Sequence, residues 1–367
     1  MIPTLGLRLT TESPVLLAAG SPAHNLIEGL DFIPGNTLRG LLAQRYLDLG
    51  GDPAGDTFRE LFLAPIPRYG FATLNGVQFL PRSAWTCKYH PGFTKQDGEN
   101  HGVNDRVIPS EGQGHCQKCG KTLEPLVGFY DPADARECRV RTRLITRTAV
   151  DPRLGTAAGG QLYSQRVIAE GQTFKASIEV PTADLAEQLG EILSRSFIAG
   201  IGTGRSRGQG WVRVEETPYL EPAWRAARER FDEFQKKLGN PMLVVTLLSD
   251  AIFVDEYFRD LTAPSLKTHL APLRINLSDW QDLPNREKTF VSTRIVHGFD
   301  GEPLGLPRTP RLAVCAGSVF CFEPKVSSPV APSGNGVGWI GENQGEGFGR
   351  AILWHPFHLK PEGRIGS

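Results

Sequence analysis

The sequence has no surplus of charge of either sign. Its 367 residues include 40 lysines and arginines and 40 aspartates and glutamates, so the formal net charge is zero. Any polyanionic partner must therefore be held by local basic patches, because no overall positive field attracts it. The hydrophobic content of 40% is ordinary for a globular protein. A chain of this length favours two domains over one.

Long apolar runs and common enzyme motifs are also missing. No run approaches the roughly 20 apolar residues that span a bilayer, and the N-terminus lacks the basic start of a signal peptide. We therefore expect a cytoplasmic protein with no membrane partner. Gly-x-Ser-x-Gly, His-Glu-x-x-His and the Gly-Lys-Ser/Thr ending of a P-loop are all absent. Their absence argues against α/β-hydrolases, zinc peptidases and P-loop NTPases.

Cysteine is scarce, with six residues in the whole chain, which excludes a disulfide scaffold. Four residues of WTCKYH and HCQKCG nevertheless have the spacing of metal ligands: Cys87 and His90, then Cys116 and Cys119. Two such pairs can place four ligands around a tetrahedral zinc ion. A complete set of four leaves no open position for water, so we predict a structural zinc that stabilises an insertion. His115 or Cys138 could replace His90 as the fourth ligand.

The order of the elements predicts an α+β fold. Alternating residues in TLGLRLTTESPVLL and QTFKASIEV indicate strands, and FIPGNTLRGLLAQRY indicates a helix. A second helix is predicted in DLAEQLGEILSRSFIAG, with Thr182 or Asp184 at its start. The order strand, helix, insertion, strand, strand, helix, glycine-rich turn, strand suits a ferredoxin-like domain. The predicted parts are a domain at 1–216 with a zinc insertion at about 82–135, a linker helix at 217–240, and a domain at 241–367.

Glycine-rich turns end both halves. The first, in IAGIGTGRSRGQGWVRVEE, lies between a predicted helix and a strand, opposite to the order of a dinucleotide fingerprint. Arg205 and Arg207 favour an anion at its backbone N–H groups, although a simple turn is also possible. The second half closes with GENQGEGFGRAILW, which has the same succession of glycines, arginine and strand. The similarity suggests a weak internal duplication.

A run of arginines precedes a long predicted hairpin. Arg139, Arg141 and Arg143 have a spacing of two residues, so on one strand they would project from the same face. Arg147 and Arg153 follow, and the hairpin at about 147–168 also contains Tyr163. Such a run is often only a solvated surface. Beside a loop with an aromatic residue, it also suits single-stranded nucleic acid, because cations bind the backbone and aromatic rings stack on the bases.

Candidate catalytic residues are few. His24 could act as a general base for RNA cleavage, and Asp31 could bind a metal ion. An exposed loop histidine and a lone surface carboxylate are the simpler interpretations. We therefore expect no enzymatic activity.

Several segments together resemble the CRISPR-associated RAMP superfamily. FIPGNTLRGLLAQRY resembles its signature after the first strand, RTAVDPRLGTAAGGQLYSQRVIAEGQTF its thumb hairpin, and GIGTGRSRGQGWVRV its glycine-rich loop. GLPRTPRLAVCAGSVFCFE and GEGFGRAIL are similar to the second domain of the two-domain subunit of type III-D systems. The order of these segments carries the resemblance.

The resemblance implies a non-catalytic subunit with two ferredoxin-like (RRM-like) domains. It would bind the repeat-derived 5′ tag of CRISPR RNA (crRNA) and cap the effector complex. Its partners would be crRNA, other RAMP subunits and the large polymerase-like subunit, with target RNA nearby. Target-cleaving members carry an aspartate in the loop before the Ile-Pro-Gly segment. Here Asp31 stands directly against that segment, which departs from the pattern. An endoribonuclease is the alternative.

The RNA-binding residues expected from the patterns and the resemblance lie in four places. They are Arg39 after the first strand; Arg139, Arg141, Arg143, Arg147, Arg153 and Tyr163 at the hairpin; Gly202, Gly204, Arg205, Arg207, Gly208 and Gly210 in the first turn; and Gly347, Gly349 and Arg350 in the second.

Overall fold

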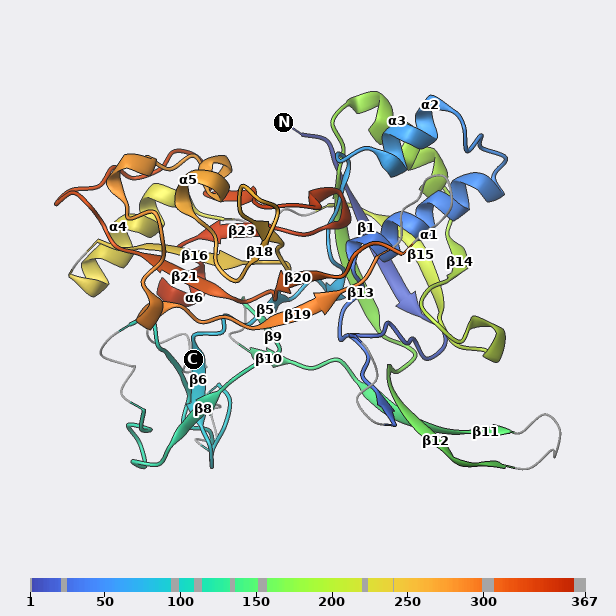
Figure 1. The fold of residues 1–367 in the computed structure, drawn as a ribbon, viewed down its shortest axis with the longest axis horizontal. Coiled ribbons are helices and arrows are strands. Elements are labelled where there is room, and N and C mark those ends of the chain that lie inside the picture. The colour runs from blue at the N-terminus through green and yellow to red at the C-terminus, as the bar shows by residue number, and fades with distance from the viewer. Residues whose placement is uncertain are drawn as a thin grey trace.

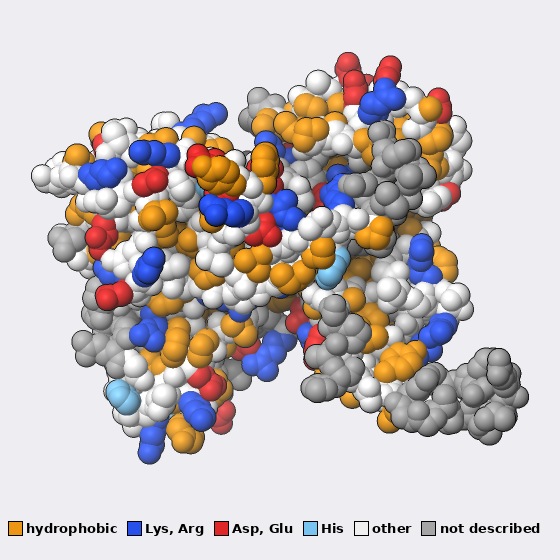
Figure 2. Space-filling model, viewed as in Figure 1, with side chains coloured by type: hydrophobic (Ala, Val, Ile, Leu, Met, Phe, Trp, Pro, Cys, Tyr) orange, Lys and Arg blue, Asp and Glu red, His pale blue; other side chains and the backbone are white. Residues whose placement is uncertain are grey.

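A computed structural model describes residues 2–20, 25–93, 99–108, 114–132, 136–150, 157–219, 224–239, 241–298 and 307–359. An N-terminal and a C-terminal body lie side by side (Figure 1). A long hairpin projects from the N-terminal body, and a small insertion of short strands lies below the C-terminal body. The described residues include no helix that is both long enough and apolar enough to span a membrane. Basic and acidic side chains are interspersed over the face shown in Figure 2.

The N-terminal body is an antiparallel sheet in the order β14-β15-β1-β13-β3, with β4 also paired to β13. Its strands are β1 (Thr4–Thr11), β3 (Arg68–Tyr69), β4 (Thr73–Leu74), β13 (Thr173–Glu179), β14 (Phe197–Gly200) and β15 (Trp211–Thr217). The helices are α1 (Gly35–Asp48), α2 (Asp56–Phe58) with its π-helical continuation (Arg59–Leu63), and α3 (Ala183–Leu193). Alternate β1 residues Leu5, Leu7 and Leu9 join a core with residues of α1 and α3. The order β15-β1-β13-β3 is consistent with a ferredoxin-like fold.

The helix predicted from DLAEQLGEILSRSFIAG is shorter than expected. It begins after Thr182, whose side chain accepts a hydrogen bond from the Leu185 N–H, as an N-cap does. It ends at Leu193, and Phe197–Gly200 forms strand β14 instead. Backbone pairing of these residues with β15 overrides their weak helical pattern. The glycine-rich turn is therefore the connection of a hairpin between two strands.

The C-terminal body contains a sheet in the order β21-β16-β23-β22. Its strands are β16 (Leu243–Leu247), β21 (Val319–Phe322), β22 (Val337–Trp339) and β23 (Arg350–Leu353), and two smaller hairpins are β17 (Phe253–Val254) with β18 (Asp260–Leu261) and β19 (Thr293–Val296) with β20 (Arg311–Val314). The helices are α4 (Ala227–Leu238), α5 (Leu266–His269), α6 (Pro356–Leu359) and 3₁₀ turns at Ala271–Leu273, Leu277–Asp279 and Arg286–Lys288. The predicted linker helix at 217–240 thus begins only at Ala227. Phe231 and Phe234 place it in the C-terminal core, since both are buried there.

The two glycine-rich turns have the same backbone hydrogen bonds at matching positions. Ile201 N–H donates to Gly210 O, and Ile340 N–H donates to Gly349 O, both at 2.8 Å. In each body a serine that follows the first strand accepts a hydrogen bond from the first residue after the turn, at 2.9 Å in both cases. Ser13 Oγ accepts from Trp211 N–H, and Ser249 Oγ accepts from Arg350 N–H.

The hairpins beside the two sheets also correspond. The hairpin of β11 (Thr142–Val150) and β12 (Ala157–Ile168) ends in a bridge between Ile168 and Val15. The hairpin of β19 and β20 ends in a bridge between Val314 and Ala251. Both bridges lie just before a strand of the adjoining sheet, β13 in one body and β21 in the other. These correspondences support the internal duplication that the sequence suggested.

The insertion contains short strands in two small sheets. They are β5 (Gln78–Phe79), β6 (Ala84–Cys87), β7 (Val103–Asp105), β8 (Leu123–Pro125), β9 (Phe129–Asp131) and β10 (Arg136–Cys138). The insertion packs on the C-terminal body through a cluster that includes Leu80, Tyr130 and Phe357. At this junction His358 Nδ1 lies 2.7 Å from the Asp105 carboxylate, and both side chains are fully buried.

His355 occupies the same junction as a neutral imidazole. Its Nε2 lies 2.9 Å from Gln78 Oε1, and its Nδ1 accepts from the Phe357 N–H at 3.1 Å. Burial, reinforced by the nearby His358 and Arg230, lowers the pKa of His355 well below its ordinary value, and Asp105 only partly opposes this. The folded state therefore excludes the proton that the unfolded state takes up near pH ~6.5.

Stability is expected to fall as the pH drops below about 6.5, where only the unfolded chain binds this proton. The contribution of His355 is up to about 1.4 kcal/mol per pH unit. In a His355→Asn variant this part of the slope should disappear. Urea unfolding between pH 5 and 8 measures it. Equal pH slopes for the wild type and the variant would contradict the neutral assignment.

Candidate nucleic-acid interface

The first glycine-rich turn lies against the base of the projecting hairpin, which consists of β11 (Thr142–Val150) and β12 (Ala157–Ile168). The turn contains a 3₁₀ helix at Arg205–Arg207 between Gly204 and Gly208, whose φ angles are 81° and 77°. Both values lie in the left-handed region that glycine adopts without strain. The turn therefore presents both arginines on a short, rigid loop.

The structure brings four predicted residues together at this point. Arg207 Nη1 donates to the Tyr163 hydroxyl at 3.1 Å, and Tyr163 on β12 is paired across the hairpin with Arg147 on β11. Arg205 is exposed on the same turn as Arg207. Within the described ranges, none of the three arginines forms an ion pair with a carboxylate. We call Arg147, Tyr163, Arg205 and Arg207 the basic cluster.

Sequence reasoning missed an aromatic residue beside this cluster. Trp211 is 41% exposed at the start of β15. A Cβ placed on Gly200 would lie 2.7 Å from Arg205 Cδ and 3.6 Å from Trp211 Cζ3, so both side chains cover this glycine. An exposed indole next to a guanidinium is a surface on which a nucleobase can stack. The sequence could have identified Trp211, because it directly follows Gly210, the last glycine of the turn.

The glycines of the turn mainly allow it to pack on the protein itself. A Cβ on Gly202 would lie 2.2 Å from Leu16 O, and a Cβ on Gly210 would lie 2.2 Å from Ile201 O. A Cβ on Gly204 would meet the Gln209 side chain at 2.3 Å. Gly208 differs, because no atom lies within 4 Å of its Cβ position. The backbone is thus sterically open only at Gly208 among these four glycines.

The arginines before the hairpin do not share one strand face as predicted. Strand β11 begins at Thr142, so Arg139 and Arg141 lie outside it. Arg139 pairs with Glu137 at 2.6 Å, and Arg143 pairs with Glu170 at 3.3 Å. Arg141 donates to backbone carbonyls at Glu170 and Gly171. The charges of Arg139 and Arg143 are partly neutralised by these carboxylates, unlike those of the basic cluster. Arg153 and His24 lie outside the described residues.

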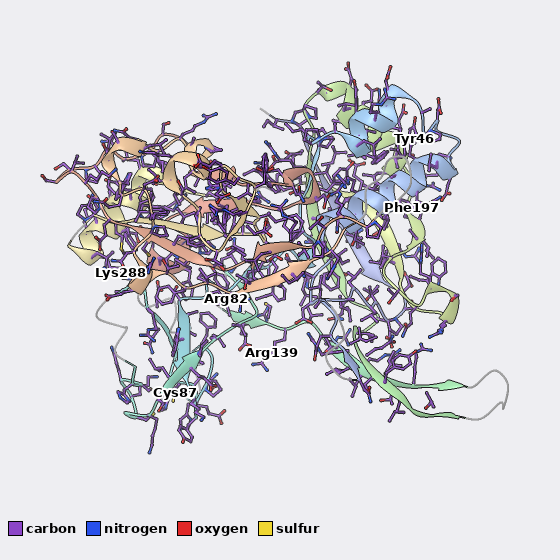
Figure 3. The ribbon with its side chains drawn as sticks, in the orientation of Figure 1. Tyr46, Arg82, Cys87, Arg139, Phe197 and Lys288 are labelled. Carbon is purple, nitrogen blue, oxygen red and sulfur yellow. The ribbon has the colours of Figure 1, made fainter. Side chains whose placement is uncertain are left out.

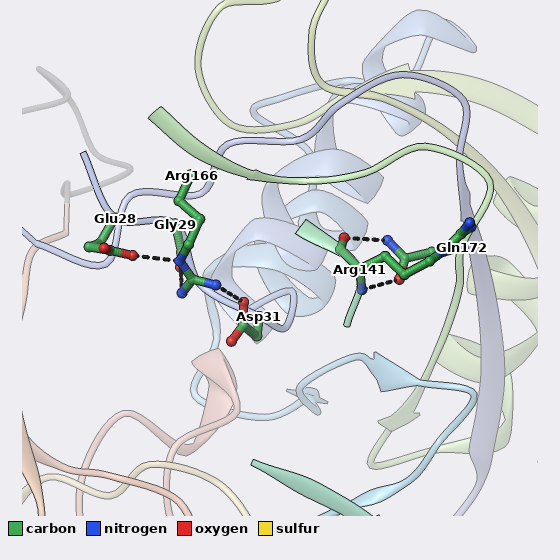
Figure 4. A network of polar contacts seen from close by, with 6 residues as sticks. All are labelled: Glu28, Gly29, Asp31, Arg141, Arg166 and Gln172. Carbon is green, nitrogen blue, oxygen red and sulfur yellow. Dashed lines mark hydrogen bonds and ion pairs between the residues drawn. The ribbon is translucent and has the colours of Figure 1, made fainter. Parts of the chain in front are cut away.

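Asp31 belongs to a polar network at the root of the hairpin (Figure 4). Arg166 on β12 pairs with Asp31 at 2.8 Å and with Glu28 at 2.5 Å, and it also donates to Gly29 O at 3.0 Å. The Asp31 side chain remains 40% exposed. The arginine holds this carboxylate in an ion pair, which competes with binding of a metal ion.

The second glycine-rich turn packs between the two bodies, and its residues 345–349 are buried. Glu346 in this turn pairs with Arg39 of α1 at 2.9 Å and with Arg308 at 2.5 Å. A Cβ on Gly347 would lie 2.3 Å from Tyr69 O, and a Cβ on Gly349 would lie 1.8 Å from Ile340 O. Arg39, Gly347 and Gly349, which we expected at the RNA, are thus engaged in contacts within the chain.

The insertion contains a cluster of metal-ligand side chains, but one ligand differs from the prediction. The ligand atoms of Cys87, His101, Cys116 and Cys119 lie within 4.8 Å of one another. His90 is outside this group, and its ring stacks on that of His101 at 4.2 Å. The loop after β6 folds back so that His101 N–H donates to His90 O, and this brings His101 to the cysteines.

The donor set fits a tetrahedral zinc ion. Cys87 Sγ lies 3.6 Å from Cys119 Sγ, and Cys116 Sγ lies 3.3 Å from His101 Nδ1. Zinc–sulfur bonds of about 2.3 Å in tetrahedral geometry separate two sulfurs by about 3.8 Å. Burial, with repulsion from His90 and Lys118, lowers the pKa of His101 and favours the neutral imidazole that a metal requires. Cys87 lies in the insertion, far in the plane of Figure 3 from the projecting hairpin.

Comparison with known proteins gives one family match. A sequence model of the RAMP superfamily matches residues 8–213. Among curated proteins, none matches the chain.

Several solved structures are similar at low identity. A cryo-EM structure of the type III-B Cmr-beta complex bound to cognate target RNA and AMPPnP contains a chain with 15% identity and a TM-score of 0.44, and the match covers 86% of each chain. Crystalline Cmr4 (Cas7) from Pyrococcus furiosus has 13% identity and a TM-score of 0.28, with 59% of this chain and 100% of that one covered. A chain of a type IV-B CRISPR complex has 11% identity and a TM-score of 0.30, with 60% and 95% covered.

Proposed function

The chain belongs to the RAMP superfamily, and from this premise we propose that it is a non-catalytic RNA-binding subunit of a type III CRISPR effector complex, of the type III-D kind. It would hold the 5′ tag of crRNA and cap the assembly. Its protein partners would be other RAMP subunits and the large polymerase-like subunit, with target RNA nearby. Zinc would be its structural metal.

The basic cluster is the observation that carries this proposal. Its arginines form no ion pair with a carboxylate in the described part of the chain. Arg207 donates to the Tyr163 hydroxyl, and Arg147 is paired with Tyr163 across the projecting hairpin. Single-stranded RNA needs cations for its phosphates and aromatic faces for its bases. The hairpin would separate neighbouring nucleotides, while Arg205 and Arg207 bind the phosphates beside it.

Duplication of one fold is part of the same proposal. We assign ferredoxin-like domains to 1–216 and 241–367, with the zinc insertion at 82–135 in the first. The matching turns and bridges support this assignment. Only the first turn carries exposed arginines, whereas the second, with Glu342 and Glu346, packs between the bodies. The first turn would thus bind RNA, and the second turn would form the contact between the domains.

Binding of defined RNAs by the purified chain tests the proposal. We expect tighter binding of single-stranded RNA that carries the repeat-derived tag than of a shuffled RNA with the same composition. If about four phosphates are neutralised, log K should fall with log[salt] with a slope near −3. Protection of a 5′ end in RNA that co-purifies with the chain would identify the bound segment. Equal, weak binding of both RNAs would contradict the proposal.

An endoribonuclease is the second candidate, because Asp31 is partly exposed beside the hairpin. We expect no Mg²⁺-dependent cleavage of labelled repeat or target RNA, since Arg166 holds the Asp31 carboxylate. The Asp31→Asn variant should therefore bind RNA and leave it intact, as the wild type does. Cleavage by the wild type that Asp31→Asn abolishes would overturn the non-catalytic assignment.

A further inference from the structure

A cavity of about 350 Å³ lies between the two bodies and is not part of the basic cluster. One wall comes from β13 and the segment around β4 and β5, on the N-terminal body. The opposite wall comes from residues 217–219 at the end of β15, from Trp224, and from the ends of β22 and β23. The volume lies within the range of small-molecule sites, which begins near ~300 Å³.

Aromatic rings and cations line this cavity together. The rings include Phe71, Tyr219, Trp224 and Trp339, and the cations are Lys175 and Arg350. The residues described as lining it include no aspartate or glutamate. Such a lining suits a ligand with a flat aromatic part and a negative charge.

Two donors in the cavity wall lack partners. The indole Nε1 of Trp224 and the Nε of Arg350 are inaccessible to water, and neither has a hydrogen-bond partner in the described structure. Arg350 Nη2 donates to the Tyr219 hydroxyl at 3.3 Å, and its guanidinium lies 6.0 Å from the Trp339 ring. Because water does not reach either atom, a ligand in the cavity does not reach them either, so the ligand-binding groups are the aromatic rings and the cationic side chains that line the cavity.

The two duplicated turns differ at the residue that reaches this cavity. Arg350 follows the second turn at the position that Trp211 occupies after the first. The second turn is packed between the bodies, which directs Arg350 into the cleft beside Tyr219 instead of toward solvent. Arg350 was expected to contact RNA at a surface turn, and the structure places it in a cavity.

We infer that this cavity binds a single nucleotide. Its base would lie among Tyr219, Trp224 and Trp339, and its phosphate would lie at Arg350 and Lys175. Base–aromatic stacking together with a phosphate–guanidinium contact uses each of these groups. The nucleotide is either part of a bound RNA strand, in which case the inference rests on the proposed function, or a free mononucleotide.

Mononucleotide binding by the full chain tests the inference directly. We expect titration with AMP, GMP, CMP and UMP to quench tryptophan fluorescence with saturation. Trp224→Ala and Arg350→Gln should each weaken binding at least tenfold. Tyr219→Phe, which keeps the ring, should weaken it less. Melting temperatures show whether each variant is folded, and a double alanine variant of Arg228 and Lys236, which are exposed on α4 and do not line the cavity, should bind mononucleotides as the wild type does.

A second measurement distinguishes the source of the nucleotide. RNA carrying 2-aminopurine at successive positions is bound to the wild type and to Trp224→Ala. Loss of quenching at one position in the variant, with competition by mononucleotides, assigns the cavity to the strand. Mononucleotide binding that RNA leaves unchanged assigns it to a free nucleotide. The inference would be overturned if the folded wild type showed no quenching of 2-aminopurine and no saturable binding of mononucleotides. This holds whether or not the chain binds RNA elsewhere.

Discussion

Replacing Cys116 with serine is expected to abolish zinc binding by this protein. The wild type should contain one zinc ion per chain by elemental analysis, and Cys116→Ser should contain almost none. Cys116 is buried with its sulfur 3.3 Å from His101 Nδ1, so its loss removes one corner of the tetrahedron. Structural zinc contributes about 10–16 kcal/mol to the folding of small zinc units. Hydrogen exchange in β6 and β8 should therefore increase strongly in the variant.

Three further variants test which side chains bind the zinc. His101→Ala should lose the metal, whereas His90→Ala should retain it, because only His101 belongs to the ligand cluster. Cys138→Ser should also retain it, since Cys138 lies on β10 outside that cluster. A wild type without zinc would refute the site. Retention of zinc by His101→Ala and loss by His90→Ala would restore the ligand set predicted from sequence.

Changing Arg205 and Arg207 together to alanine is expected to weaken RNA binding by about 30-fold. Two exposed phosphate contacts of about 1 kcal/mol each, the usual net value of a hydrogen bond, account for this change. The slope of log K against log[salt] should become shallower by about 1.4, because each phosphate contact on a single strand contributes ~0.7. Filter binding or fluorescence anisotropy over a range of salt concentrations measures both quantities.

The matched control removes the same charge elsewhere. Arg228 and Lys236 are exposed on α4, which lies in the other body from the hairpin in Figure 1. Their double alanine variant should bind RNA nearly as the wild type does, because the effect depends on location and not on net charge. The turn does not bind RNA if the Arg205 and Arg207 variant keeps the wild-type affinity. The same conclusion follows if both double variants lose RNA affinity equally.

Local patterns predicted the regular elements well where nearby residues decide the structure. Alternation of apolar and polar residues in TLGLRLTT corresponds to β1, and Thr182, one of the two predicted starts, caps α3. The strand predicted after the second glycine-rich turn likewise corresponds to β23. The predicted C-terminal end of this helix was wrong, because pairing with β15 determines the conformation of Phe197–Gly200.

The metal cluster shows where such reasoning stops. Three cysteines were identified from their spacing, because a Cys-x-x-Cys turn is local. The histidine was misassigned, because the path of a long loop decides which ring reaches the cysteines. The same limit applies to the cavity at Arg350, whose walls come from segments far apart in the chain.

The sequence by itself determined that two turns rich in glycine each precede a strand and that the first is basic. It also determined the alternation that builds both sheets. Tertiary structure alone decided that the first turn is exposed beside Tyr163, whereas the second is packed on Tyr69 and paired with Arg39. Backbone conformation follows from glycine positions within each turn, but exposure depends on which distant surface covers it. The same loop therefore offers a basic surface in one body and forms the junction in the other.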